Sequence, residues 1–223
     1  MKYVFHFDVV LDHWPELLDG AWLTIRLSAM AMVLGLAIAV VCAYARTAGP
    51  RFVRWLIAAY IEIIRNTPFL VQIFLIYFSL PGLGIRLDAN EAALAAMVAN
   101  LGAYATEIVR AGIDAVPQGQ IEAARALGLK RLYIFRFVVL FPALKMVFPA
   151  LASQFILLML GSSVVSAISA VELTAVTNSL QSTTFRSFEF YFAATALYLV
   201  MALGFRASLA AIYWLVFLRG RAT

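Results

Sequence analysis

Apolar runs long enough to cross a lipid bilayer recur along this chain, and they restrict its fold more than any other feature. A helix needs about 20 consecutive apolar residues to span the hydrocarbon core of a membrane. Hydrophobic residues make up 64% of the 223 positions and charged residues only 13%, which is far from the usage of a soluble domain. The sequence predicts about five transmembrane helices, at residues 21–44, 55–80, 91–109, 137–160 and 191–218.

These spans leave no polar tract long enough to fold as a separate soluble domain. We therefore expect an all-α integral membrane protein with a single transmembrane domain over residues 1–223 and its core at 20–218. The chain has one cysteine, Cys42, which excludes an intrachain disulfide and a cysteine-based metal cluster. Its two histidines, His6 and His13, both lie near the N-terminus, so no metal site and no catalytic residues are expected in the membrane.

The positive charges predict the orientation in the membrane, because Lys and Arg favour cytoplasmic loops. Most of them fall in the loop after the first span, in the connection after the third and in the tail: Arg46, Arg51, Arg54, Arg110, Arg125, Lys130, Arg131, Arg136, Arg219 and Arg221. The opposite side has only Lys2, Arg86 and Arg186. The N-terminus should then be outside and the C-terminus cytoplasmic, as an odd number of spans requires. The net charge of +5 is assigned to these loops and to anionic lipid headgroups; nucleic acid is not implied.

Polar residues inside the third span form a second pattern. Asn100, Tyr104 and Glu107 recur at spacings of four and three, which places them on one face of a helix. Ionisable groups within a membrane are costly and have either a structural or a functional reason. This face is either a set of hydrogen bonds between helices or the wall of a polar translocation pathway.

The second span is less regular than the others. Glu62 and Arg65 are three residues apart and predict an ion pair on one helical face. Pro68 follows, and because proline removes a helical hydrogen bond, the helix should bend or restart there.

The connection at about 113–136 is polar, yet it has the pattern of a structured element. Residues 118–127 favour a short helix, and Gly128 should end it in a left-handed conformation. A small-residue face on a helix that lies flat under the bilayer can fit into a groove of another protein; the alternative is an interfacial helix that merely ends two spans. The candidate docking positions are Glu122, Ala123, Ala124, Ala126 and Gly128.

The chain resembles the permease subunits of polar amino-acid ABC importers, the histidine, glutamine and glutamate permease family. Residues 65–72 are similar to the family's Arg-Gly-Thr-Pro-Leu-Leu-Val-Gln, and residues 102–113 to its Ala-Ala-Tyr-x-x-Glu-Ile-x-Arg-Gly-Gly-Ile. Residues 122–124 read Glu-Ala-Ala, as in the EAA loop that docks a coupling helix into the ATPase, and residues 171–174 are also similar. The similarity covers nearly the whole chain.

This resemblance implies the transmembrane domain of a type I ABC importer in the bacterial inner membrane. Two permease chains, as a homo- or heterodimer, would surround the pathway, with two ATP-binding subunits beneath and a periplasmic solute-binding protein that delivers the amino acid. The chain has no Gly-rich phosphate loop followed by Lys-Ser/Thr, so ATP and Mg should belong to the partner and this subunit should not be an enzyme. A stand-alone channel or secondary transporter is the alternative, although no internal repeat supports it.

One stretch departs from the family pattern. Leu160 and Gly161 stand where family members often carry Lys-Asp, so no acid is available there for a cationic substrate. Either the substrate is neutral or acidic, or this chain is the non-binding half of a heterodimeric pair. For the pathway we expect Asn100, Gln154 and Ser163 to lie near mid-membrane, and Tyr104 and Glu107 nearer the inner end. Ser162, next to Ser163, is a further candidate.

Overall fold

Every regular element in the described part of the chain is a helix, so the predicted all-α fold is confirmed. The computed structural model describes residues 3–219; Lys2 and Arg221, which contributed to the predicted orientation, lie outside the described residues. The elements are α1 (Asp8–Asp12), α2 (Trp14–Ala48), α3 (Arg51–Arg65), α4 (Phe69–Ser79), η1 (Leu80–Leu83), α5 (Ala89–Asp114), α6 (Gln118–Ala126), α7 (Arg131–Tyr133), η2 (Ile134–Leu140), α8 (Phe141–Gly161), η3 (Ser162–Ile168), α9 (Leu173–Thr184), α10 (Ser187–Tyr213) and η4 (Trp214–Leu218).

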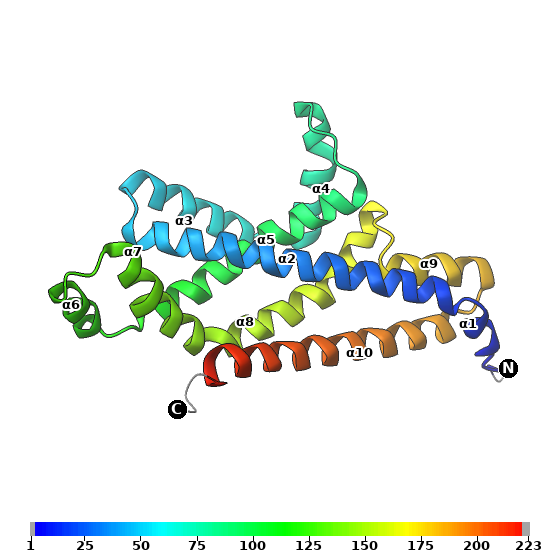
Figure 1. The fold of residues 1–223 in the computed structure, drawn as a ribbon. Coiled ribbons are helices and arrows are strands. Elements are labelled where there is room, and N and C mark those ends of the chain that lie inside the picture. Colours follow the sequence, from blue (N-terminus) through cyan, green and yellow to red (C-terminus); the bar gives the residue numbers. More distant parts are fainter. Residues whose placement is uncertain (1–2, 220–223) are drawn as a thin grey trace.

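Four of the predicted spans are continuous helical segments. Within the described range, the segments long and apolar enough to cross a membrane are Trp14–Ala48, Ala89–Asp114, Arg131–Ile168 and Ser187–Leu218. α5 packs against α2 and α8, and α8 packs against α10. α1 and η4 lie at opposite ends of this bundle, and α6 lies at the same end as η4 (Figure 1).

The remaining predicted span is broken into two helices. α3 and the segment formed by α4 and η1 meet at an angle of 110°, and α4 projects away from the bundle (Figure 1). Pro68 lacks an N–H and disfavours a helical conformation at Thr67, so α3 ends before it. Thr67 Oγ1 donates to the carbonyl of Ile63 at 2.8 Å, and Asn66 Nδ2 donates to that of Glu62 at 2.8 Å. The predicted bend or restart at the proline is thus confirmed. The Thr67 side chain satisfies the Ile63 carbonyl, which the break leaves without a helical partner, whereas the Glu62 carbonyl also accepts from the Asn66 N–H at 3.1 Å.

The predicted ion pair between Glu62 and Arg65 is wrong. Among residues 3–219 no ion pair joins them. Glu62 Oε2 instead accepts a hydrogen bond from Asn66 Nδ2 at 2.9 Å, and the Arg65 guanidinium lies over the ring of Tyr104, 5.4 Å from its centroid. Spacing alone did not predict this, because the helix ends at Arg65 and leaves its side chain free to reach a neighbouring helix.

The centre of the bundle is α5, whose buried face consists largely of alanine and glycine. Lipid tails give no hydrophobic force between helices, so membrane helices associate through close packing of small residues. A β-carbon on Gly35 of α2 would lie 2.9 Å from Leu101 Cδ2 of α5. One on Gly112 of α5 would lie 2.8 Å from Val147 Cγ1 and 3.0 Å from the carbonyl oxygen of Ala143 on α8. A side chain at Gly112 would therefore meet the backbone of α8, and one at Gly35 the Leu101 side chain of α5.

At the N-terminal end of the bundle, α9 is held across α2 and α10 by a buried carboxylate. Glu172 caps α9 by accepting from the Ala175 N–H at 2.9 Å, and its other oxygen accepts from the Tyr198 hydroxyl of α10 at 2.7 Å. Thr24 Oγ1 of α2 accepts from the Leu173 N–H at 3.2 Å. Burial raises the pKa of the Glu172 carboxyl, and the hydrogen bonds it accepts oppose that rise. α9 thus ties together the ends of two spans.

Replacing Gly112 by leucine should destabilise the bundle, because the new side chain meets a backbone carbonyl that cannot move without displacing α8. Overpacking of this kind costs about 1–3 kcal/mol. Gly204→Leu is the matched control, since no atom lies within 4 Å of a β-carbon built on Gly204 of α10. Thermal unfolding of the detergent-solubilised protein should show a lower Tm for Gly112→Leu only. Equal melting temperatures would contradict close packing at this position.

Candidate functional site

A hydrogen bond between two side chains joins α5 to α4, the second helix of the broken span. Asn100 Nδ2 donates to Gln72 Oε1 on α4 at 3.0 Å. Gln72 is buried, and its amide nitrogen donates to the carbonyls of Ile64 at 2.7 Å and Thr67 at 3.0 Å, on both sides of Asn66. The pair therefore connects α5 to backbone that the break leaves without helical partners.

Gln72 was not among the predicted site residues. The signal was a lone amide in an otherwise apolar helix, a few residues after Pro68. Its role depends on where the break turns the chain, which the sequence pattern does not determine.

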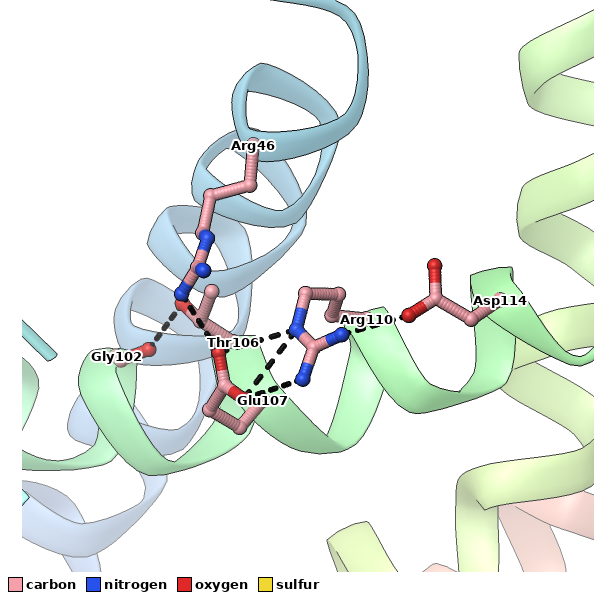
Figure 2. A network of polar contacts seen from close by, with 6 residues as sticks. All are labelled: Arg46, Gly102, Thr106, Glu107, Arg110 and Asp114. Carbon is pink, nitrogen blue, oxygen red and sulfur yellow. Dashed lines mark hydrogen bonds and ion pairs between the residues drawn. The ribbon is translucent and has the colours of Figure 1, made fainter. Parts of the chain in front are cut away.

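Near the other end of α5, Glu107 is the centre of a charge network that Figure 2 shows. Glu107 Oε1 accepts from Arg46 Nη1 of α2 at 3.1 Å, and Glu107 Oε2 accepts from Arg110 Nη2 at 2.7 Å. Arg110 Nη1 in turn donates to Asp114 Oδ2 at 2.6 Å. Thr106, on the preceding position, donates back to the Gly102 carbonyl at 2.6 Å. This charge network therefore links the ends of α2 and α5.

The predicted polar face of α5 is thus a set of contacts between helices in this structure. Asn100 contacts α4, Tyr104 lies under Arg65 at the end of α3, and Glu107 contacts α2. Of the two interpretations left open, the geometry supplies direct support for helix-to-helix bonding. A role of the same residues in a pathway remains a proposal.

The candidates on α8 and η3 lie elsewhere. Gln154 is half-buried on α8, which runs unbroken to Gly161, so these two positions do share a helical face. Ser163 is half-buried and donates to the Leu160 carbonyl at 3.0 Å. Ser162 is fully buried and donates to the Met159 carbonyl at 2.6 Å. Its hydroxyl is bonded within its own chain in this structure, and its role as a pathway residue stays a prediction.

The structure does not bring these three candidates together with the α5 face. Within the described range, no hydrogen bond joins Gln154, Ser162 or Ser163 to Asn100. In the same range, no cluster of three His, Cys, Asp or Glu side chains could hold a metal ion.

The polar connection after α5 contains the predicted short helix, α6. Gly128 follows it with a φ of 71°, a left-handed conformation that glycine adopts without strain. The Gly128 N–H bonds the Arg125 carbonyl at 2.9 Å, and the Leu129 N–H bonds the Ala124 carbonyl at 3.2 Å. These two bonds define a Schellman motif. The predicted helix and its glycine stop are confirmed.

The candidate docking residues of α6 do not all face outward. Glu122, Ala123 and Ala126 are exposed, whereas Ala124 is only 5% exposed and belongs to the core of this chain. Ala124 lies on the face by which α6 packs against η2, and its role as a contact position for a partner stays a prediction. Leu127, directly before the stop glycine, is 79% exposed at the end of α6, and it was not among the predicted docking positions.

Residues 31–215 match the protein family described as "Binding-protein-dependent transport system inner membrane component". The L-cystine transport system permease protein TcyB of Bacillus subtilis (strain 168) is 38% identical over 160 residues, which cover 72% of this chain and 68% of that protein. The probable glutamine ABC transporter permease protein GlnM of the same organism is 34% identical over 199 residues, covering 87% of this chain and 90% of that one.

A solved structure shows the same fold. A crystal structure of an amino acid ABC transporter with histidines superimposes with a TM-score of 0.84 at 35% sequence identity, covering 95% of this chain and 99% of that one. The apolar spans, the polar connection with its glycine-capped helix and these matches agree in one assignment. The chain belongs to the family of binding-protein-dependent transport system inner membrane components, and it is a permease subunit of an ABC importer.

Proposed function

We propose that this chain forms one half of the pathway through which an ATP-driven importer carries an amino acid across the bacterial inner membrane. The observation that carries the proposal is α6, a helix with a rigid glycine cap and an exposed outer face. Only three residues separate its first residue from the end of α5, the helix with the polar face. The names of the relatives, which include cystine and glutamine permeases, supply the substrate class.

The proposed assembly contains a second permease subunit, identical or different, and two ATP-binding subunits under α6. ATP and Mg would be held by those subunits, and this chain would hold no cofactor and catalyse no reaction itself. A periplasmic solute-binding protein would dock at the opposite end, near α9. The family description, with its reference to binding proteins, supports this division of labour.

We further propose that the N-terminus is periplasmic and the C-terminus cytoplasmic. The support is that the end of α2, the end of α5, α6 and η4 lie together at one end of the bundle (Figure 1). Nine of the 17 basic residues belong to these segments, to the start of α3, to the stretch from Lys130 to Arg136 that follows α6 or, as Arg219, directly follow η4, and positive charge favours the cytoplasmic side. α6 then faces the compartment that contains ATP.

Cysteine labelling tests this orientation. In a background where Cys42 is replaced by alanine, cysteines introduced at Asp12 or Asp88 should react with an impermeant thiol reagent added to intact cells. Cysteines introduced at Arg51 or Arg131 should react only after the membrane is permeabilised. The reverse labelling pattern would overturn the orientation and, with it, the position of α6 next to the ATP-binding subunits.

Replacing Gly128 by valine should uncouple transport from ATP hydrolysis. Valine resists a φ of 71°, at a cost of about 1–2 kcal/mol, so the end of α6 should change its geometry. Gly128→Asn should retain most activity, because asparagine tolerates the left-handed region. Gly119→Ala is the control within α6, since nothing lies within 4 Å of a β-carbon there. The measurement is uptake per assembled complex; normal uptake by Gly128→Val would rule out α6 as the coupling element.

The substrate that we propose is a neutral or acidic amino acid. A zwitterion in the membrane must keep its ammonium and carboxylate bonded to protein groups. Gln154 and Ser163 are half-buried polar groups along α8 and η3, while Leu160 and Gly161 add no acid for a cationic side chain. Selection should therefore rest on neutral hydrogen-bonding groups.

Uptake kinetics test the pathway residues. Gln154→Ala and Asn100→Ala should each raise the KM for glutamine about fivefold, the effect of losing one hydrogen bond of about 1 kcal/mol. Ser153→Ala is the neighbouring control, since that exposed hydroxyl bonds only its own helix. ATPase activity stimulated by the loaded binding protein is followed in parallel. Unchanged kinetics in both variants, or a preference for arginine, would show that the partner permease holds the substrate.

A further inference from the structure

Four arginines surround a hollow at the junction of α2 and α3, outside the contacts assigned to transport. The hollow has a volume of about 550 Å³, and we name it the arginine pocket. It is lined by Arg46, Thr47, Arg51, Arg54, Trp55, Arg110 and Asp114. Three separate elements, α2, α3 and α5, therefore bring positive charge to one place.

The arginine pocket carries more positive than negative charge. Arg46 and Arg110 are held by Glu107 and Asp114 in the charge network of Figure 2. Arg51 and Arg54 are exposed, and no acid pairs with either of them in the described part of the chain. The surplus of two positive charges is therefore concentrated on the two arginines of α3.

The start of α3 adds hydrogen-bond donors to the same place. Arg51 is the first residue of α3, and Pro50 before it provides no side-chain cap. The first N–H groups of a helix lack intrahelical acceptors and carry partial positive charge. An anion in the arginine pocket would meet these N–H groups as well as two guanidinium groups, which form paired hydrogen bonds with phosphate.

The surroundings of the arginine pocket favour a lipid over a soluble anion. Trp55 and Phe52, 65% and 67% exposed, flank the arginines, and tryptophan is enriched at the level of lipid headgroups. The arginine pocket also lies where α2 ends and α3 begins. A connection between two membrane-spanning segments lies at the membrane surface. We propose that the arginine pocket binds the phosphate of an anionic phospholipid, whose acyl chains run along the apolar side of α3.

Native mass spectrometry of the permease assembled with its ATP-binding subunits tests this site. Phosphatidylglycerol and phosphatidylcholine are titrated as probes. Wild type should bind phosphatidylglycerol more tightly than phosphatidylcholine. The double variant Arg51→Gln/Arg54→Gln should bind phosphatidylglycerol about tenfold or more weakly, since each basic residue near a membrane contributes about 1 kcal/mol. Arg51→Lys/Arg54→Lys keeps the charge and should retain most of the binding.

The matched control is Arg136→Gln/Arg219→Gln, which removes the same charge outside the arginine pocket. Arg136 lies in η2 and Arg219 directly after η4, and both are exposed. An equal loss in this control would overturn the site in favour of diffuse attraction. Displacement of phosphatidylglycerol by inorganic phosphate at comparable concentration would identify a free anion as the ligand instead. Binding to the isolated subunit but not to the complex would show that a partner protein covers the pocket, and would also refute the proposal.

Discussion

The close approach of α5 to α2 and α8 is the constraint on which the other contacts depend. In a bilayer, apolar side chains gain little by leaving lipid for another helix, so the helices are held by packing at short range. Gly35 and Gly112 allow this approach. Only at such a distance can Glu107 of α5 reach Arg46 of α2. A wider spacing would break this charge network, which links the ends of α2 and α5.

The charge network at the end of α5 gives this bundle a defined relation to α6. Single exposed ion pairs contribute about 0–1 kcal/mol, but Glu107 here shares two arginines from two helices, and Arg110 also holds Asp114, the last residue of α5. Ala115, Val116 and Pro117 alone connect that residue to α6. A displacement of α6 therefore reaches the network through a short segment with a proline, and no long loop can absorb it.

Local signals in the sequence predicted most of the fold. An apolar run of sufficient length, a proline and a stop glycine each act through their own residue and its neighbours, so the spans, the break before Phe69 and the cap at Gly128 were predictable. The error concerns a tertiary contact. Arg65 contacts Tyr104 and not Glu62.

Helical periodicity explains both what was predicted at the candidate site and what was not. It places Asn100, Tyr104 and Glu107 on one face correctly, but it does not say which helix that face meets. Gln72 could not be selected for the same reason, because its acceptors become available only where the break turns the chain. The sequence pattern thus predicts which residues share a face of a helix, and the packing of the helices decides what that face contacts.

The break between α3 and α4 also bears on the life of the subunit before assembly. α3, with 15 residues, is about 22 Å long, so the break falls within a hydrocarbon core of about 30 Å. Residues 65–68 are exposed in the single chain, and irregular backbone at this depth is stable only when protein or water covers it. A newly inserted copy without partners thus presents polar groups to lipid. The subunit therefore needs protein or water to cover this break from the moment it is inserted, and assembly with its partners would supply that cover.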